Sequence, residues 1–159
     1  MQNIADTGED LDALIAAFAA AEYLVEVGPK PIAVELGHPT TALDRILDGR
    51  AWAIVTAYNP DGRRQSNRRN ETAHASLEAC LDRIAPTARL PARNRDRAAR
   101  WPDEPGWLFT PDDVTQADRL ARRFGQRAIV AGGAGQRSEL RIYDASCTAL
   151  PDFARIVRS

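Results

Sequence analysis

The sequence is poor in the residues on which small metal-bound or disulfide-bonded proteins depend. It contains two histidines, two cysteines and one methionine among 159 residues. His38, His74, Cys80 and Cys147 do not have the spacing of metal ligands, and two cysteines are too few for a disulfide framework. We therefore expect no metal site, a reduced Cys80 buried on the core side of a helix, and an unpaired Cys147.

Long hydrophobic runs and a basic amino terminus are also missing. The longest apolar stretch, Leu14 to Ala21, is about half of a membrane span. The first twelve residues are acidic, unlike the basic start of a secretory signal. These absences predict a soluble, cytoplasmic protein that does not enter the membrane.

What remains has the composition of one ordinary globular domain, 1–159, in which the charge is unevenly distributed. Hydrophobic residues make up 44% and charged residues 27% of the chain. Residues 1–48 hold nine acids against two bases, whereas residues 63–100 hold ten arginines against four acids. Such an asymmetry is typical of an interaction surface, although solvated loops produce it as well.

Hydrophobic periodicity divides the chain into alternating helices and strands, without repeats or an interdomain linker. Turn and capping residues then set the expected boundaries. The expected elements are a helix after Thr7, a hairpin from Tyr23 to Leu36, a short helix from Thr40 or Thr41 to Gly49, a strand at 52–57, a helix at 66–84, a strand at 87–90, an arginine-rich loop at 91–105, a strand at 107–109, a helix at 112–124 capped by Thr110, and strands at 128–131 and 139–143.

The order of these elements favours an α+β fold. From Trp52 onward it reads β-α-β-β-α-β plus one strand, which predicts a ferredoxin-like core with helices packed mainly on one face of the sheet. An α-β-β-α extension precedes this core. A three-layer α/β fold around a mostly parallel sheet is the alternative, because the count of elements does not separate the two.

The segment from Asn59 to His74 is the first candidate site, because it leaves the most apolar strand, turns, and enters the next helix at Ser66. Strand ends that lead into helix N-termini often bind ligands in α/β proteins. Asn70 and His74 lie on or beside the apolar stripe of that helix, so each needs a polar partner, either neighbouring backbone or a ligand. Arg68 and Arg69 occupy its first turn, where they would suit a phosphate or carboxylate, or would simply be solvated.

Residues 93–101 form a second basic segment, in which four arginines precede Trp101. Arginine beside an aromatic residue suits single-stranded nucleic acid, but the pI of about 6.1 and the lack of an RNA-binding motif argue against that partner. The glycine-rich turn 132–135 runs into a strand rather than a helix, and neither a Walker loop nor a nucleophile elbow is present. We therefore expect no cofactor.

Four pieces of the sequence form a recognisable set. They are 52–60 (WAIVTAYNP), Ser66 with Asn70, 101–105 (WPDEP) and 120–129 (LARRFGQRAI). In this order and spacing they resemble a bacterial family of domains of unknown function, number 3293, from about Tyr23 to Leu140. The resemblance implies a stand-alone bacterial domain, brings no established activity, and directs attention to the polar positions Asn59, Ser66, Asn70, Glu104 and Gln126.

Two functions compete. The leading hypothesis is a polar cleft that binds an anionic small molecule, such as a nucleotide or phosphorylated metabolite. The alternative is a protein-interaction or regulatory module whose arginine-rich loop binds an acidic protein partner. The sequence leaves open whether the protein is an enzyme, and the first candidates for proton transfer are His74 and Glu104. The predicted ligand-binding residues are Asn59, Ser66, Arg68, Arg69, Asn70, His74, Glu104 and Gln126.

Overall fold

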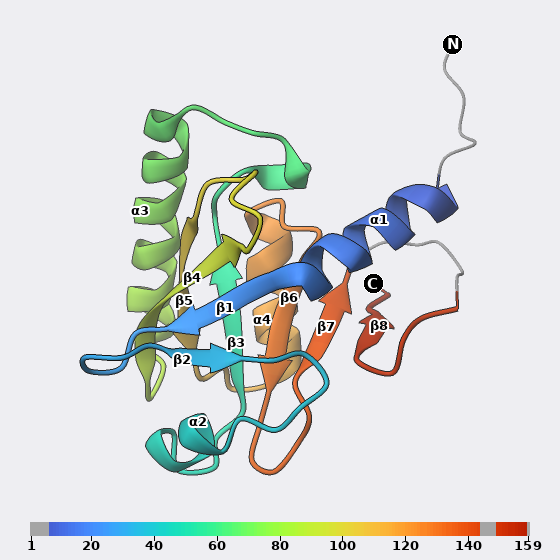
Figure 1. Ribbon diagram of the computed structural model, residues 1–159. Coiled ribbons are helices and arrows are strands. Elements are labelled where there is room, and N and C mark those ends of the chain that lie inside the picture. Colours follow the sequence, from blue (N-terminus) through green and yellow to red (C-terminus); the bar gives the residue numbers. More distant parts are fainter. Residues whose placement is uncertain (1–6, 144–148, 159) are drawn as a thin grey trace.

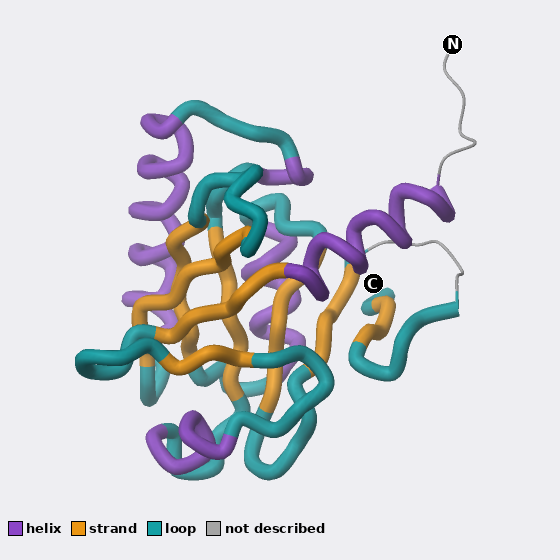
Figure 2. Tube along the Cα trace, in the orientation of Figure 1, coloured by secondary structure: helices purple, strands orange, loops and turns teal. Residues whose placement is uncertain are grey.

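The computed structural model describes residues 7–143 and 149–158. Within them lie four α-helices, one 3₁₀ turn and an eight-stranded sheet (Figure 1, Figure 2). The helices and the turn are α1 (Thr7–Ala20), α2 (Thr41–Ile46), η1 (Pro60–Gly62), α3 (Asn67–Ile84) and α4 (Val114–Arg123). The strands are β1 (Ala21–Val25), β2 (Ile32–Val34), β3 (Trp52–Thr56), β4 (Arg89–Asp96), β5 (Glu104–Phe109), β6 (Ala128–Gly132), β7 (Glu139–Ile142) and β8 (Ala154–Ile156). None of the helices in these ranges is long and apolar enough to cross a membrane.

The sheet is antiparallel almost throughout. Its strands follow the order β2-β1-β4-β5-β3-β6-β7-β8, and among them the pair β7–β8 is parallel. β3 lies among the central strands and is buried at all five positions, as its apolar sequence predicted. β8 was not predicted. The α+β class is confirmed, and the alternative of a mostly parallel sheet is wrong.

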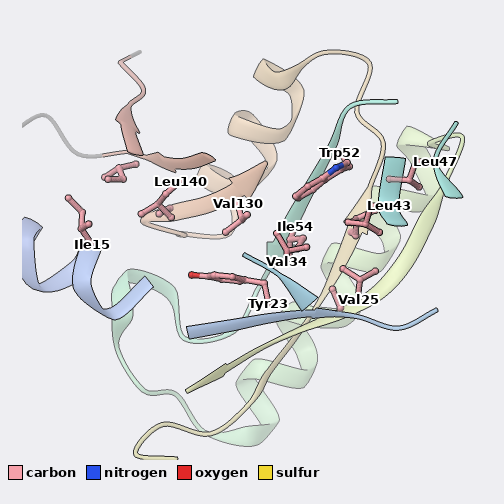
Figure 3. Close-up of a cluster of buried hydrophobic side chains, with 14 of the residues drawn as sticks. Ile15, Tyr23, Val25, Val34, Leu43, Leu47, Trp52, Ile54, Val130 and Leu140 are labelled. Atoms are coloured by element: carbon pink, nitrogen blue, oxygen red, sulfur yellow. The ribbon is translucent and has the colours of Figure 1, made fainter. Parts of the chain in front are cut away.

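Alternate residues of β3 divide the core into two clusters on opposite faces of the sheet. Ala53 and Val55 pack with the apolar stripes of α3 and α4. Trp52 and Ile54 belong to a second cluster, which includes Leu11 of α1 and is shown in Figure 3. In Figure 1, α1 accordingly passes in front of the sheet and α4 lies behind it. Helices therefore cover both faces, whereas the sequence predicted mainly one.

The two helices predicted most clearly have the expected inward faces. Leu77, Leu81 and Leu120 are buried, and Phe124 is half-buried against the same cluster. Cys80 is buried and free, as predicted. The prediction for the second cysteine falls on residues outside the described part of the chain. Helical periodicity thus located these elements correctly, because the spacing of apolar residues is a local property.

The sheet curls until the segment after β2 approaches the start of β7. The backbone N–H of Gly37 donates to the carbonyl of Ser138 at 2.9 Å, and the N–H of Ser138 donates to the carbonyl of His38 at 3.0 Å. The Ser138 hydroxyl also donates to the Glu35 carbonyl at 2.7 Å. The concave face therefore encloses the second cluster.

Most of the segment predicted as an arginine-rich loop is strand. β4 continues to Asp96 and β5 begins at Glu104, so the connection is only 97–103. Because β4 pairs with β1, its arginines lie beside acids from the amino-terminal part of the chain. Arg93 is 3.6 Å from Glu26, and part of the charge asymmetry of the sequence is thus offset inside the fold.

The start of α4 also differs from the prediction. Asp113, not Thr110, caps the helix, because its carboxylate accepts the Gln116 N–H at 2.9 Å. The Thr110 hydroxyl instead accepts the N–H of Ala88, just before β4, at 2.9 Å. Val114, which was expected in the core, is 38% exposed because the helix begins later than predicted.

Candidate functional site

A cleft of about 560 Å³ opens at one end of the concave face. The antiparallel pairings bring the carboxyl ends of β3 and β4 to this end, together with the amino ends of β1, β5 and β6. α1 runs directly into β1 (Figure 1). Residues of α1 line one side of the cleft. A volume of this size is in the range of small-molecule sites.

The cleft has an apolar side and a polar side. The apolar side comes from α1 and the floor of the sheet, with Leu14, Ala17, Phe18, Ile54 and Val130. The polar side comes from the strand ends and the connections between them, with Asn59, Asn94, Arg95, Arg100, Glu104 and Gln126. An amphipathic arrangement of this kind suits a ligand that has both a nonpolar body and polar groups.

Glu104 is a largely buried carboxyl on the polar side. Asn59 Nδ2 and Trp101 Nε1 donate to the same oxygen, Oε1, at 2.7 and 2.8 Å. Within the described part of the chain, Oε2 accepts no hydrogen bond and no cation pairs with the carboxyl. Burial raises the pKa of Glu104 above its usual range, and the two hydrogen bonds lower it by less. One oxygen is therefore held in place while the other remains available.

The orientation of Asn59 is set by backbone groups that can only donate. Its Oδ1 accepts the Gln65 N–H at 2.9 Å and Asn70 Nδ2 at 3.0 Å. Its own backbone N–H donates to Asn70 Oδ1 at 2.9 Å. Asn59 also has φ +49°, a left-handed conformation in which asparagine is favoured among non-glycine residues. These contacts settle which amide atom is oxygen, so Asn59 turns its Nδ2 toward Glu104.

The second donor, Trp101, is positioned by the last residue of β4. Asp96 accepts the backbone N–H of Ala98 at 3.0 Å, of Arg100 at 3.0 Å and of Trp101 at 3.2 Å. These hydrogen bonds, that of Ala98 above all, lower the pKa of Asp96. Asp96 therefore shapes the connection 97–103 and brings the indole N–H to Glu104.

The N-P turn after β3 contacts the F-G-Q segment after α4. The Asp61 N–H donates to the Gly125 carbonyl at 2.8 Å, and Gln126 Nε2 donates to the Tyr58 carbonyl at 3.1 Å. Gly125 has φ +66°, and a Cβ there would lie 2.8 Å from Pro60 Cβ, so the contact requires glycine. Two segments that are far apart in the sequence thus form one wall of the cleft.

Three of the eight residues predicted to bind a ligand line the cleft: Asn59, Glu104 and Gln126. Asn70 is buried directly behind Asn59 and supports it, without being part of the lining. The structure thus brings these four residues together, although they come from the β3 turn, α3, β5 and the end of α4.

The other four predicted residues lie away from the cleft. Ser66 caps α3 by accepting the Arg69 N–H at 3.3 Å, and the Arg68 and Arg69 side chains are exposed. His74 packs on the α3 side of the sheet, where its ring is stacked on Trp107 with centroids 6.0 Å apart. The anion site predicted at the start of this helix therefore does not coincide with the cleft.

Sequence reasoning missed the contributions of Tyr23, Asn94 and α1 to the cleft. Tyr23 and Asn94 lie directly opposite each other in the β1–β4 pair, so only the strand register brings them to one site. No local signal marks either residue. For Trp101 there was a signal, since the W-P-D-E-P segment belonged to the family resemblance.

Positive charge enters the cleft through Arg95, Arg100 and Arg127. Arg95 is 3.4 Å from Asp103. Arg100 is 3.9 Å from Asp96, and its side chain is 83% exposed, a geometry that gives a weak ion pair. Within the described ranges, no group of three or more potential ligands could hold a metal ion.

Comparison with known proteins yields one family. The family described as "Protein of unknown function (DUF3293)" matches residues 55–129, a shorter span than the resemblance implied. No curated protein and no solved structure matches the chain. The matched segment contains the polar residues around Glu104, whereas α1 precedes it. Through residues 55–129 the chain belongs to DUF3293, a family of proteins of unknown function.

Proposed function

We propose that the cleft binds a small anionic molecule and that Glu104 is the residue that exchanges a proton with it. The observation that carries this proposal is the state of the Glu104 carboxyl, which is largely buried and has no cation partner in the described residues. Its Oε1 accepts two N–H groups, and its Oε2 accepts none from them. Carboxyls with a raised pKa in a cleft are typical of functional sites, because proton transfer needs a pKa closer to neutrality.

The arginines at the cleft support an anionic ligand. Arg100 is mostly exposed, and Asp96, its acidic neighbour, already accepts three backbone N–H groups. A phosphate or carboxylate would therefore compete with a weak existing pair rather than a strong one. The anion and Glu104 would occupy different parts of the same cleft.

The alternative, an acidic protein partner at the arginine-rich segment, has less support. Arg93 and Arg95 lie in β4, where each has a carboxylate within 4 Å. Arg97 is 3.9 Å from Glu22. The chain's own acids therefore offset part of the positive charge that an acidic partner would bind.

A thermal-shift screen against phosphorylated metabolites tests the proposed function, because a specific ligand raises the melting temperature by mass action. Arg100→Ala should lower the affinity for any ligand found by about threefold to tenfold. Arg68→Ala removes an exposed arginine outside the cleft and serves as the matched control. If both variants lose the same amount of affinity, or if neither loses any, the assignment of the anion to this cleft is contradicted.

We also infer that β3-α3-β4-β5-α4-β6 is a ferredoxin-like core within a single domain. The strand order β4-β5-β3-β6, antiparallel at each pair, supports the first point. The continuous sheet that joins both core clusters supports the second. Calorimetric unfolding should then show one cooperative transition, and two separable transitions would contradict a single domain.

A further inference from the structure

Two acceptor oxygens of the cleft remain unused on the side of Glu104, whereas the donors available to a ligand are on Arg95 and Arg100 and on the Asn94 amide. Glu104 Oε2 and Gln126 Oε1 accept no hydrogen bond from the described residues. The hydrogen bonds of these two side chains are made by Glu104 Oε1 and Gln126 Nε2 instead. Neither oxygen is among the buried atoms that lack a partner, so both are open to solvent. The Asn94 amide also lines the cleft without a side-chain hydrogen bond in this part of the chain. A complementary ligand must therefore bring N–H or O–H donors.

Three aromatic side chains line the same cleft: Phe18, Tyr23 and Trp101. The hydrogen bond from Trp101 to Glu104 uses the edge of the indole ring, which leaves the ring faces for packing. Aromatic side chains beside free hydrogen-bonding groups suit a planar heterocycle, since stacking and edge recognition then act together. The volume of about 560 Å³ accommodates a molecule of nucleotide size.

We propose that the ligand is a nucleotide whose base donates an amino N–H to Glu104 Oε2. Its phosphate lies toward Arg95 and Arg100, which line the cleft from the end of β4 and the following connection. This inference rests on the proposed function and makes it more specific. It requires a base with an amino group, as in cytosine or adenine, rather than an oxo group at the same position.

The preference for an amino group follows from the contacts of Glu104. When Glu104 is ionised, an oxo group would place a second acceptor against Oε2, and the water displaced by the ligand would leave both oxygens without a donor, which is unfavourable. An amino group supplies the missing donor. Two matched pairs of nucleotides differ in this respect: CMP has a 4-amino group where UMP has an oxo group, and AMP has a 6-amino group where IMP has an oxo group.

Isothermal titration of the wild-type protein with CMP, UMP, AMP and IMP tests the inference. We expect the amino member of at least one pair to bind about 5- to 100-fold more tightly than its oxo partner, the range expected for one satisfied against one unsatisfied buried group. Cytidine and ribose 5-phosphate separate the contributions of the base and the phosphate. Each should bind more weakly than CMP if both parts are recognised.

Glu104→Gln should reverse the preference rather than abolish binding. The two N–H donors of Asn59 and Trp101 require an oxygen at the position of Oε1, so the new amide must place its NH₂ group where Oε2 was. The variant should then prefer UMP to CMP, or IMP to AMP. Glu71→Gln, which alters an exposed carboxylate on α3, is the matched control and should keep the wild-type preference.

The possible outcomes separate this inference from the proposed function. Binding of another anion that depends on Arg100, without binding of any nucleotide, would refute the inference and leave the proposed function intact. Absence of any ligand for the cleft would refute both. Binding of nucleotides with equal affinity for amino and oxo members would also refute the inference, as would a Glu104→Gln variant that folds and keeps the wild-type order.

Discussion

Two carboxyl groups withdrawn from water, Asp118 in α4 and Glu104 in β5, have opposite surroundings. Asp118 accepts two hydrogen bonds from Arg141, at 2.9 and 2.8 Å, and one from the Tyr143 hydroxyl at 2.8 Å. Burial would raise the pKa of Asp118, but the Arg141 contacts hold it below its usual range. Glu104 receives only neutral donors on one oxygen, and burial keeps its pKa raised.

The difference separates a structural charge from a candidate functional one. At Asp118 both oxygens are occupied and the charge is balanced, so the group ties α4 to β7 and has nothing to offer a ligand. At Glu104 the balance is incomplete, and the unused oxygen is in a cleft. A carboxyl in a cleft whose charge has no partner is the better indicator of a site, because a carboxylate that is already paired has nothing left to offer a ligand.

Removing the charge of Asp118 should have the largest effect on stability. Asp118→Asn leaves Glu139, 2.6 Å from Arg141 Nη1, as the remaining counter-charge of the buried guanidinium. We therefore expect a loss of about 3 kcal/mol in the free energy of unfolding, the lower end of the range for a broken buried ion pair. Urea denaturation measures it, with Asp112→Asn at an exposed position as the control. A loss below about 1 kcal/mol would show that the charge of Asp118 does not stabilise the fold, contrary to the structural role assigned to it.

Asn70→Ala should have an intermediate effect and should link stability to the site. The change removes both hydrogen bonds between Asn70 and Asn59, and the expected loss is about 1–3 kcal/mol, typical of a buried hydrogen-bonding group. Asn67→Ala, at the exposed start of the same helix, is the control for helix propensity. An unchanged melting temperature would mean that Asn70 is not a support for Asn59.

The smallest expected effect is on the pH dependence of stability. It distinguishes Glu104 from Asp118 most directly, because the two groups should change stability with opposite signs. The folded-state pKa of Glu104 is raised, so wild-type stability relative to Glu104→Gln should fall as pH rises from the ordinary glutamate pKa through the folded value. The folded-state pKa of Asp118 is lowered, so stability relative to Asp118→Asn should fall as pH decreases from the ordinary aspartate pKa through the folded value. Denaturation across the acidic range measures both slopes, and slopes of the same sign would contradict the assigned roles.

The family-specific motifs contain part of the lining of the cleft, and strand register brings the other lining residues to it. Asn59, Glu104 and Gln126 were predicted because motif segments contain them, and the structure brings them to one cleft. Arg68 and Arg69 were predicted from the helix N-terminus, yet they are exposed away from it. Helical position shows on which face a residue lies, but it does not show which other segment meets that face.

The sequence by itself determined the order of the elements from α1 to β7, the inward faces of α3 and α4, and the buried central strand β3. Periodicity, caps and turns reveal these features because they depend on residues a few positions apart. Only the tertiary structure decided that β4 extends through the arginines, that the sheet curls, and that α1 covers its concave end. The contact of Asn59 with Glu104 spans 45 residues and that of Gln126 with Tyr58 spans 68. Such contacts depend on strand order and register, which local patterns do not encode, and the cleft is made of them.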